Sequence, residues 1–257
     1  MQAVILAGGR GTRLAPYTTV LPKPLMPIGD RPILEIILYQ LKQHGFTDIT
    51  IAVGYLSHLL EAYFGDGSRF GITIRYSHED QPLGTAGPLA LISNSILNEP
   101  FLVMNGDVLT DLNFSSMYRQ HCDENAAITI GLYLKEMRID FGVLQVSDDR
   151  RVISYVEKPS FPYMVSMGVY VLSPKVLEFI PKGQRFDFPD LVNLLLERGE
   201  KVMGYPFQGE WLDIGRPEDY ARAAERLHSL SLAEPSLPLV DCYEAPIISR
   251  VGGNGIK

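Results

Sequence analysis

The first half of the chain alternates short apolar runs with longer amphipathic ones. Three runs of strand length are almost wholly apolar: AVILA (3–7), DITIAV (48–53) and FLVM (101–104). Residues 32–45 have helical spacing, with Pro32 suited to a helix start and Gly45 to a helix end. We expect a further strand over 71–79 and a further helix over 85–96. This alternation predicts an α/β fold with a mostly parallel sheet, and ligands of such sheets bind beyond the carboxyl ends of the strands.

The pattern changes from about residue 126 onward. Strand-like runs with short connections follow one another: AAITIGLYL (126–134), FGVLQVS (141–147), VISYVEKP (152–159) and VSMGVYVLS (165–173). SDDRR at 147–151 is typical of a hairpin turn. Helical patterns return at PKVLEFIP (174–181), FPDLVNLLLERGE (188–200) and RPEDYARAAERLHSL (216–230). We therefore expect an inserted, antiparallel subdomain within one domain at 1–230. Residues 231–257 show no period and no hexapeptide repeat, and we interpret them as a tail or interface segment.

Composition narrows the classes of ligand. The chain has 257 residues and a formal net charge of −7, so it has no overall attraction to nucleic acid or to an anionic membrane. Phosphate recognition would have to come from locally placed cations, which favours a small phosphorylated ligand. Cys122 and Cys242 form no metal or disulfide pattern and are expected to be reduced, buried thiols. No run has membrane-spanning length and no signal peptide is evident, so we expect a cytoplasmic protein.

A glycine-rich loop follows the first apolar run. Its backbone N–H groups could approach phosphate oxygens closely, as in many strand-to-loop junctions. The dinucleotide fingerprint is disfavoured because Leu14 stands where a third glycine or alanine is needed, and a P-loop would need Gly-Lys followed by Ser or Thr. A plain turn would not explain Arg13 or Lys23, which lies between two prolines that restrict the backbone. We interpret the segment as a phosphate-binding loop.

The loop belongs to an ordered set of motifs. LAGGRGTRLAPYTTVLPKPLMPIGDRPILE is followed by QPLGTAGPLAL, FLVMNGD, DFGV, VEKP and EWLDIGRPEDY. Across roughly residues 1–228 this order resembles the sugar-1-phosphate nucleotidyltransferases, or NDP-sugar pyrophosphorylases, and is most similar to GDP-mannose pyrophosphorylase-like catalytic domains. The resemblance implies a Rossmann-like three-layer sandwich with a mixed central sheet and an inserted sugar-binding subdomain. It also implies an enzyme of nucleotide-sugar biosynthesis that uses Mg²⁺, a nucleoside triphosphate and a sugar 1-phosphate.

The resemblance assigns roles by motif position. Arg13 would hold the triphosphate, and Lys23 would neutralise charge at the α-phosphate. The nucleotide would contact Leu6, Ala7, Gly8, Gly9, Gly11, Thr12, Glu79, Gly84 and Thr85. The sugar phosphate would contact Gly142, Glu157, Lys158 and Ser166. Asp107 follows an apolar strand, where a carboxylate suits a hard cation or a simple turn equally well. The resemblance makes it a metal ligand together with Asp213.

The identity of the base and the sugar depends on two positions. Glu79 stands where relatives that use uracil or thymine often carry glutamine, and a carboxylate that only accepts hydrogen bonds suits the adjacent donors of guanine. We therefore expect GTP and mannose 1-phosphate, while Gln81 leaves a uridylyltransferase open. Ser166 replaces an asparagine of many relatives, so heptose, N-acetylmuramate and glucose phosphates also stay open. A sensor that binds nucleotide sugars without turnover is a further hypothesis, and the sequence leaves both a monomer and a homodimer open.

Overall fold

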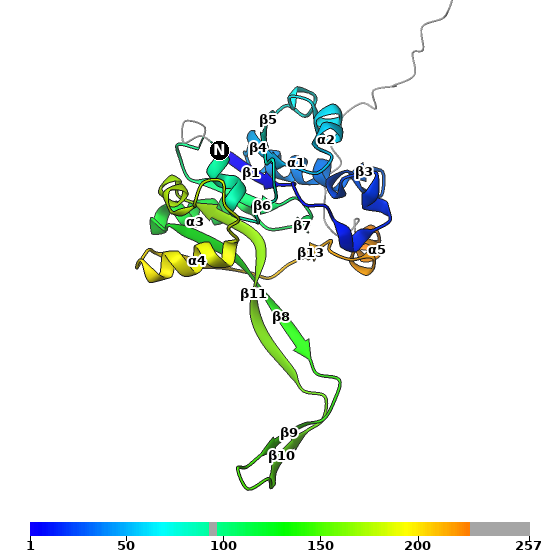
Figure 1. Cartoon of the computed structure of the whole chain (residues 1–257), viewed down its shortest axis with the longest axis vertical. Coiled ribbons are helices and arrows are strands. Elements are labelled where there is room, and N and C mark those ends of the chain that lie inside the picture. Colours follow the sequence, from blue (N-terminus) through cyan, green and yellow to red (C-terminus); the bar gives the residue numbers. More distant parts are fainter. Residues whose placement is uncertain (93–96, 227–257) are drawn as a thin grey trace, which may run out of the picture.

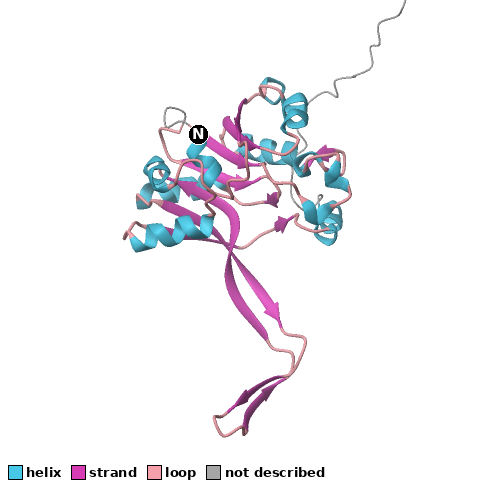
Figure 2. Ribbon diagram, viewed as in Figure 1, coloured by secondary structure: helices cyan, strands magenta, loops and turns pink. Residues whose placement is uncertain are grey.

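The computed structural model describes residues 1–92 and 97–226. Its central element is a seven-stranded sheet with the strand order β12-β8-β11-β6-β1-β4-β5 (Figures 1 and 2). Its strands are β1 (Gln2–Leu6), β4 (Asp48–Val53), β5 (Thr73–His78), β6 (Phe101–Asn105), β8 (Ile128–Arg138), β11 (Ser160–Leu172) and β12 (Val202–Phe207). β11 runs antiparallel to its neighbours β6 and β8, whereas the other adjacent pairs are parallel. The predicted mostly parallel, mixed sheet is confirmed.

Helices cover both faces of this sheet. One face packs on α1 (Ile33–Gln43), α2 (Ser57–Phe64) and α3 (Phe114–Glu124), and the other on α4 (Phe188–Glu197) and the 3₁₀ helices η5 (Gly87–Leu91) and η6 (Pro174–Phe179). Successive strand residues point to opposite faces. In β1, Ala3 and Ile5 therefore join the core beneath α1, whereas Val4 joins the core beneath α4. This arrangement is the expected three-layer sandwich.

Smaller elements surround the carboxyl ends of the central strands. Two short antiparallel pairs are β2 (Pro27–Ile28) with β3 (Arg31–Pro32) and β7 (Val108–Thr110) with β13 (Trp211–Asp213). Single 3₁₀ turns are η1 (Thr12–Leu14), η2 (Tyr17–Thr19), η3 (Lys23–Leu25) and η4 (Ser68–Phe70). The last described helix is α5 (Pro217–Arg226), and none of the helices described is long and apolar enough to cross a membrane.

Three expectations from the sequence are wrong in detail. The helical pattern at 174–181 forms only the 3₁₀ helix η6. The helix expected over 85–96 is only the 3₁₀ helix η5, and residues 93–96 lie outside the described residues. The N–H groups of Ala86 and Gly87 both donate to the carbonyl oxygen of Phe186, at 2.9 Å each, so a neighbouring loop holds this backbone instead of an α-helical turn. Cys122, expected to be buried, is exposed on α3. The expected tail at 231–257 also lies outside the described residues.

A long ribbon projects from one side of the sheet (Figure 1). β8 and β11 pair from Ile128 to Arg138, but β12 accompanies β8 only as far as Tyr133. Beyond that point the two strands continue alone and end in a hairpin of β9 (Val143–Val146) and β10 (Val152–Val156). We call residues 134–165 the arm. It is the predicted antiparallel insertion, and its tip contains the predicted turn, closed by Ser147 N–H donating to the Arg151 carbonyl at 2.9 Å.

Candidate active site

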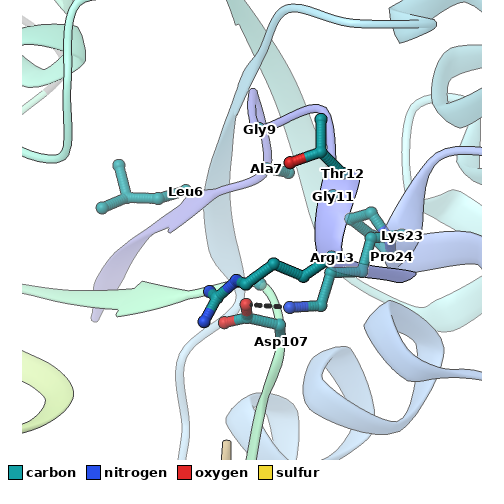
Figure 3. Close-up of a pocket in the computed structure, with 10 residues that line it drawn as sticks. Leu6, Ala7, Gly9, Gly11, Thr12, Arg13, Lys23, Pro24 and Asp107 are labelled. Carbon is teal, nitrogen blue, oxygen red and sulfur yellow. Dashed lines mark hydrogen bonds and ion pairs between the residues drawn. The ribbon is translucent and has the colours of Figure 1, made fainter. Parts of the chain in front are cut away.

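Two hollows lie at the carboxyl ends of the central strands, a third lies between β8, β13 and α5, and Arg13 lines all three. The phosphate hollow is lined by Leu6, Ala7, Gly9, Gly11, Thr12, Arg13, Lys23, Pro24, Gly106 and Asp107 (Figure 3). The base hollow adds, among others, Gly8, Arg10, Glu79, Gly84, Thr85, Asn105 and Arg185. The outer hollow is lined by Arg13, Tyr133, Lys135, Met137, Trp211, Leu212, Asp213, Gly215, Arg216, Asp219 and Arg222. The chain thus folds its predicted phosphate loop into the edge where the sheet predicts a ligand.

The glycines of the loop allow close approach of neighbouring segments. Gly11 has a φ of 62°, and a Cβ added there would lie 2.9 Å from Thr18 Cγ2. The Thr18 hydroxyl donates to the Gly11 carbonyl at 2.8 Å, which ties the loop to η2. A Cβ on Gly8 would lie 2.3 Å from Glu79 Oε1. A side chain at either position would displace a neighbouring residue, so space requires glycine at both, and at Gly11 the positive φ favours glycine as well.

Lys23 and Asp107 form an ion pair at the floor of the phosphate hollow (Figure 3). Lys23 stands at the start of η3 and is only 8% exposed. Pro22 precedes it in extended conformation and Pro24 follows it inside the turn, as expected for a restrained lysine. The Arg13 guanidinium points toward the same carboxylate (Figure 3). Two cations therefore meet at a place where several phosphate oxygens could be neutralised.

Asp213 joins Asp107 through the pairing of two short strands. Asp213 lies opposite Val108 in the β7–β13 pair, and Ile214 N–H donates to the Asp107 carbonyl at 3.0 Å. Burial raises the pKa of Asp213, the Asp107 carboxylate raises that pKa further, and Lys23 and Arg13 oppose the shift. Two carboxylates far apart in the sequence are thus neighbours, as the resemblance implies.

These carboxylates fit a divalent cation. Asp107 Oδ1 is buried and has no hydrogen-bond partner among the residues described, so one oxygen of this acid is left for a ligand. No group of three or more His, Cys, Asp or Glu side chains able to hold a metal occurs in the described part of the chain. Mg²⁺ is commonly held by one or two carboxylates, with waters and substrate phosphates as its other ligands. The donor set therefore suits Mg²⁺ bound together with a nucleotide.

Glu79 lies at the back of the base hollow. Its Oε2 accepts from the Leu83 N–H at 3.1 Å, and its backbone N–H donates to the Val53 carbonyl at 3.0 Å. A Cβ on Gly54 would lie 3.0 Å from Oε1, so the carboxylate packs against bare backbone. Among the described residues, no donor is recorded at Oε1. An acceptor oxygen is therefore left for a ligand.

Asp187, at the start of α4, was not predicted as a site residue. Its Oδ1 accepts from Thr85 N–H at 2.8 Å and from Thr85 Oγ1 at 3.2 Å, while Phe188 N–H donates to Thr85 Oγ1 at 2.9 Å. A Cβ on Gly84, whose φ is 81°, would lie 2.6 Å from the same oxygen. Asp187 and Asp190 also form a capping box. Asp-x-x-Asp before an apolar run signals a helix start, but that signal does not reveal the contact with the base hollow.

Comparison with known proteins identifies the family. Residues 2–229 match the family model described as nucleotidyl transferase. The chain belongs to this family. It is 34% identical to a UTP–glucose-1-phosphate uridylyltransferase of Synechocystis, over 94% of this chain and 67% of that protein. It is 33% identical to a mannose-1-phosphate guanylyltransferase of Mycobacterium tuberculosis, over 88% of this chain and 64% of that protein.

A solved structure extends the comparison to the fold. HddC from Yersinia pseudotuberculosis, complexed with GMP-PN, superposes with a TM-score of 0.68 and 26% identity, over 88% of this chain and 99% of that chain. This family member therefore has the fold of the nucleotide-diphospho-sugar transferases, as the motifs imply. It spans only about two thirds of the length of the two curated relatives, 67% and 64%.

Of the four residues predicted for sugar phosphate, three lie on the arm, apart from the hollows of this nucleotidyl transferase family member. Gly142, Glu157 and Lys158 are on the arm, and Ser166 is on β11. Ser166 Oγ donates to Tyr170 Oη at 3.1 Å, and none of the four lines the three hollows. The predicted nucleotide, phosphate and metal residues are brought together, whereas the predicted sugar-binding residues are not.

Proposed function

We propose that this protein transfers the guanylyl group of GTP to mannose 1-phosphate and releases pyrophosphate. The broader reaction, nucleotidyl transfer from a nucleoside triphosphate to a sugar 1-phosphate, is supported by one observation above all. Arg13, Lys23, Asp107 and Asp213 converge beside a glycine loop in a member of the nucleotidyl transferase family.

The reaction needs positioning and charge neutralisation rather than a protein nucleophile. A phosphate oxygen of the sugar 1-phosphate attacks the α-phosphorus, and the bond from that phosphorus to the pyrophosphate oxygen breaks. Lys23 would bind at the α-phosphate, and Arg13 would bind the departing pyrophosphate. Asp107 and Asp213 would hold Mg²⁺, which supplies positive charge to the phosphate oxygens when bound.

The choice of GTP is supported by Glu79. Glu79 lines the base hollow, the Leu83 N–H donates to its Oε2, and Oε1 is the acceptor oxygen that no described donor occupies. Guanine presents N1–H and an exocyclic amine side by side, and both need acceptors. The relative from Mycobacterium tuberculosis is a guanylyltransferase for mannose 1-phosphate, and the HddC structure holds GMP-PN. These similarities favour the same base and, from the first of them, mannose.

A uridylyltransferase is the second candidate, since the Synechocystis relative uses UTP and glucose 1-phosphate. Gln81 was the residue that favoured it from the sequence. Its Nε2 donates to the Gly183 carbonyl at 3.4 Å, and Gln81 does not line the base hollow. This placement removes the residue that favoured uracil from the base hollow, whose acidic and amide lining residues are Glu79, Asn105 and Asp107.

A substrate matrix tests the proposal. Release of pyrophosphate is measured with four nucleoside triphosphates against mannose, glucose, heptose and N-acetylmuramate 1-phosphates in the presence of Mg²⁺. We expect GTP with mannose 1-phosphate to give the highest kcat/KM. A wild-type preference for UTP would contradict the choice of base, and no turnover with any pair would contradict the enzyme and favour a nucleotide-sugar sensor.

Glu79→Gln provides the matched variant. Losing a charge-assisted hydrogen bond costs about 1.5–3 kcal/mol, so the KM for GTP should rise about 10- to 100-fold. The KM for mannose 1-phosphate should change little, because Glu79 lies in the base hollow. An equal rise in both constants would show that Glu79 supports the fold of the site instead of reading the base.

A further inference from the structure

The arm concentrates the exposed apolar surface of the protein. Of the 19 large hydrophobic residues recorded as exposed in the described chain, 13 lie on the arm. They are Leu134, Met137, Ile139, Phe141, Leu144, Val146, Val152, Ile153, Tyr155, Val156, Phe161, Tyr163 and Met164. Phe141 is 77% exposed and Ile153 66%. Soluble proteins seldom leave such a group of side chains in water unless another surface covers it.

Both faces of the arm carry these side chains. In β10, Tyr155 and Val156 pair in regular register with Leu144 and Val143, so their side chains point to opposite faces. A two-stranded ribbon is marginally stable by itself in water. The arm therefore needs a partner surface, and its unpaired strand edges offer backbone groups to the same partner.

The base of the β9–β10 hairpin presents polar groups. Tyr155 Oη donates to Glu157 Oε2 at 2.5 Å, and a Cβ on Gly142 would lie 2.3 Å from that same hydroxyl oxygen. Gly142, Tyr155 and Glu157 thus form one packed unit. Lys158 follows with a φ of 44°, a conformation that costs a lysine about 1 kcal/mol or more. Strained residues cluster at functional sites, which agrees with the sugar-phosphate roles implied by the sequence.

The ribbon carries this unit away from its own site. Six consecutive pairs, from Val165 opposite Tyr133 to Ser160 opposite Arg138, continue the ladder without a register shift. Five residue steps of an extended strand span about 17 Å. The hairpin lies beyond that distance and points outward (Figure 1). The outer hollow meanwhile holds Asp213 and the cations Arg13, Lys135, Arg216 and Arg222, but no described residue between Ile139 and Val165 lines it.

We propose that the protein is a homodimer in which each arm packs on the partner copy and brings Glu157 and Lys158 to the partner's outer hollow. A second copy of the chain would explain both the exposed arm and the absence of its residues from the outer hollow. One copy has an arm that leaves its own outer hollow beyond Met137 and carries the predicted sugar-phosphate residues at the base of its hairpin, and one site lacks those residues. In a two-fold dimer each copy gives and receives the same segment. The role of the arm residues in turnover rests on the proposed function.

Complementation between two defective variants tests the exchange. Lys23→Met removes a residue of the body, and Lys158→Met removes a residue of the arm, so each homodimer should lose most of its turnover. In a heterodimer with exchanged arms, one site combines the intact body of the Lys158→Met chain with the intact arm of the Lys23→Met chain. Since half of randomly formed dimers are heterodimers, with one intact site of two, coexpression should restore about one quarter of wild-type activity. Activity no higher than the mean of the two variants would overturn the exchange.

Mass measurement tests the interface separately. Light scattering should give twice the 28.7 kDa chain mass for the wild type. Ile153→Glu places a charge on the arm and should yield a folded monomer with at least tenfold lower turnover. Leu196→Glu is the matched control, because Leu196 is 57% exposed on α4, and it should stay dimeric and active. A fully active wild-type monomer, or a dimeric Ile153→Glu, would overturn the proposal. If Ile153→Glu does not fold, the complementation result decides.

The two experiments separate this inference from the proposed function. A wild-type dimer that is disrupted by Ile153→Glu but releases no pyrophosphate with any substrate pair would contradict the proposed function and keep the interface. Turnover by a monomer at assay concentration would keep the proposed function and contradict the exchange.

Discussion

Asp187→Ala perturbs a side chain that joins α4 to the wall of the base hollow. The variant loses the N-cap of α4, which is worth about 1 kcal/mol. It also loses the bonds from Thr85 N–H and Oγ1 to a carboxylate, worth about 1.5 kcal/mol at this partly exposed position. The free energy of unfolding should therefore fall by about 2–3 kcal/mol, and Tm by about 5–10 °C for a domain of this size.

Asp190→Ala is the matched control for that change. Asp190 Oδ2 accepts from the Asp187 N–H at 3.1 Å within the same capping box, and no bond from Asp190 to Thr85 is recorded. Its loss should cost about 0.5 kcal/mol. Urea unfolding gives the free energy of unfolding of each variant, and initial rates give the KM of each variant for GTP. We expect KM for GTP to rise several-fold in Asp187→Ala only. Equal KM values in both variants would refute the reasoning that Asp187 positions the wall of the hollow.

Three further changes have expected outcomes. Asp107→Asn should lower turnover by orders of magnitude in a Mg²⁺ assay while circular dichroism stays native, and near wild-type rates would exclude the metal assignment. Gly168→Ala should lower the free energy of unfolding, measured with urea, by at least about 1 kcal/mol more than Gly183→Ala does. Both glycines have positive φ, but only at Gly168 would a Cβ meet a side chain, 2.5 Å from Asn105 Nδ2. Burial lowers the pKa of His121 from 6.5 to about 4, so its neutral form favours folding above pH 6.5 and that contribution disappears as the pH falls toward 4. This lost contribution to the free energy of unfolding should approach about 3 kcal/mol. Between pH 7 and 4.5, the free energy of unfolding should therefore decrease less in His121→Gln than in the wild type.

The sheet and its phosphate loop could be predicted because their signals are local. An apolar run that ends in Asn-Gly-Asp places Asp107 at a strand end, and the structure has it just after β6. The partnership with Asp213 has no local signal, since it depends on β13 pairing with β7, and only the family resemblance supplied it. The bond between Asp187 and Thr85 joins residues 102 positions apart, so no local pattern could predict it.

The course of the arm could not be predicted for a different reason. A period of two indicates strands, but it does not say whether a strand stays within a sheet or leaves it. The run at 152–159 was predicted only as a strand, and its first two residues, Val152 and Ile153, are both exposed on the single chain. The sequence motif singled out Glu157 and Lys158 as sugar-phosphate residues, but it did not predict that they lie far from the phosphate loop.

The separation of the arm from the sheet allows the two parts to change independently. The β8–β11 pairing fixes Arg138 opposite Ser160, and the chain between these two residues makes no ladder contact with the central sheet. Replacing residues 139–159 with a hairpin of another length or sequence would preserve the register of every sheet strand and the position of Lys23, Asp107 and Asp213. Under the proposed role of the arm, acceptor preference would change by exchange of this single continuous segment, without rebuilding the fold that carries the reaction.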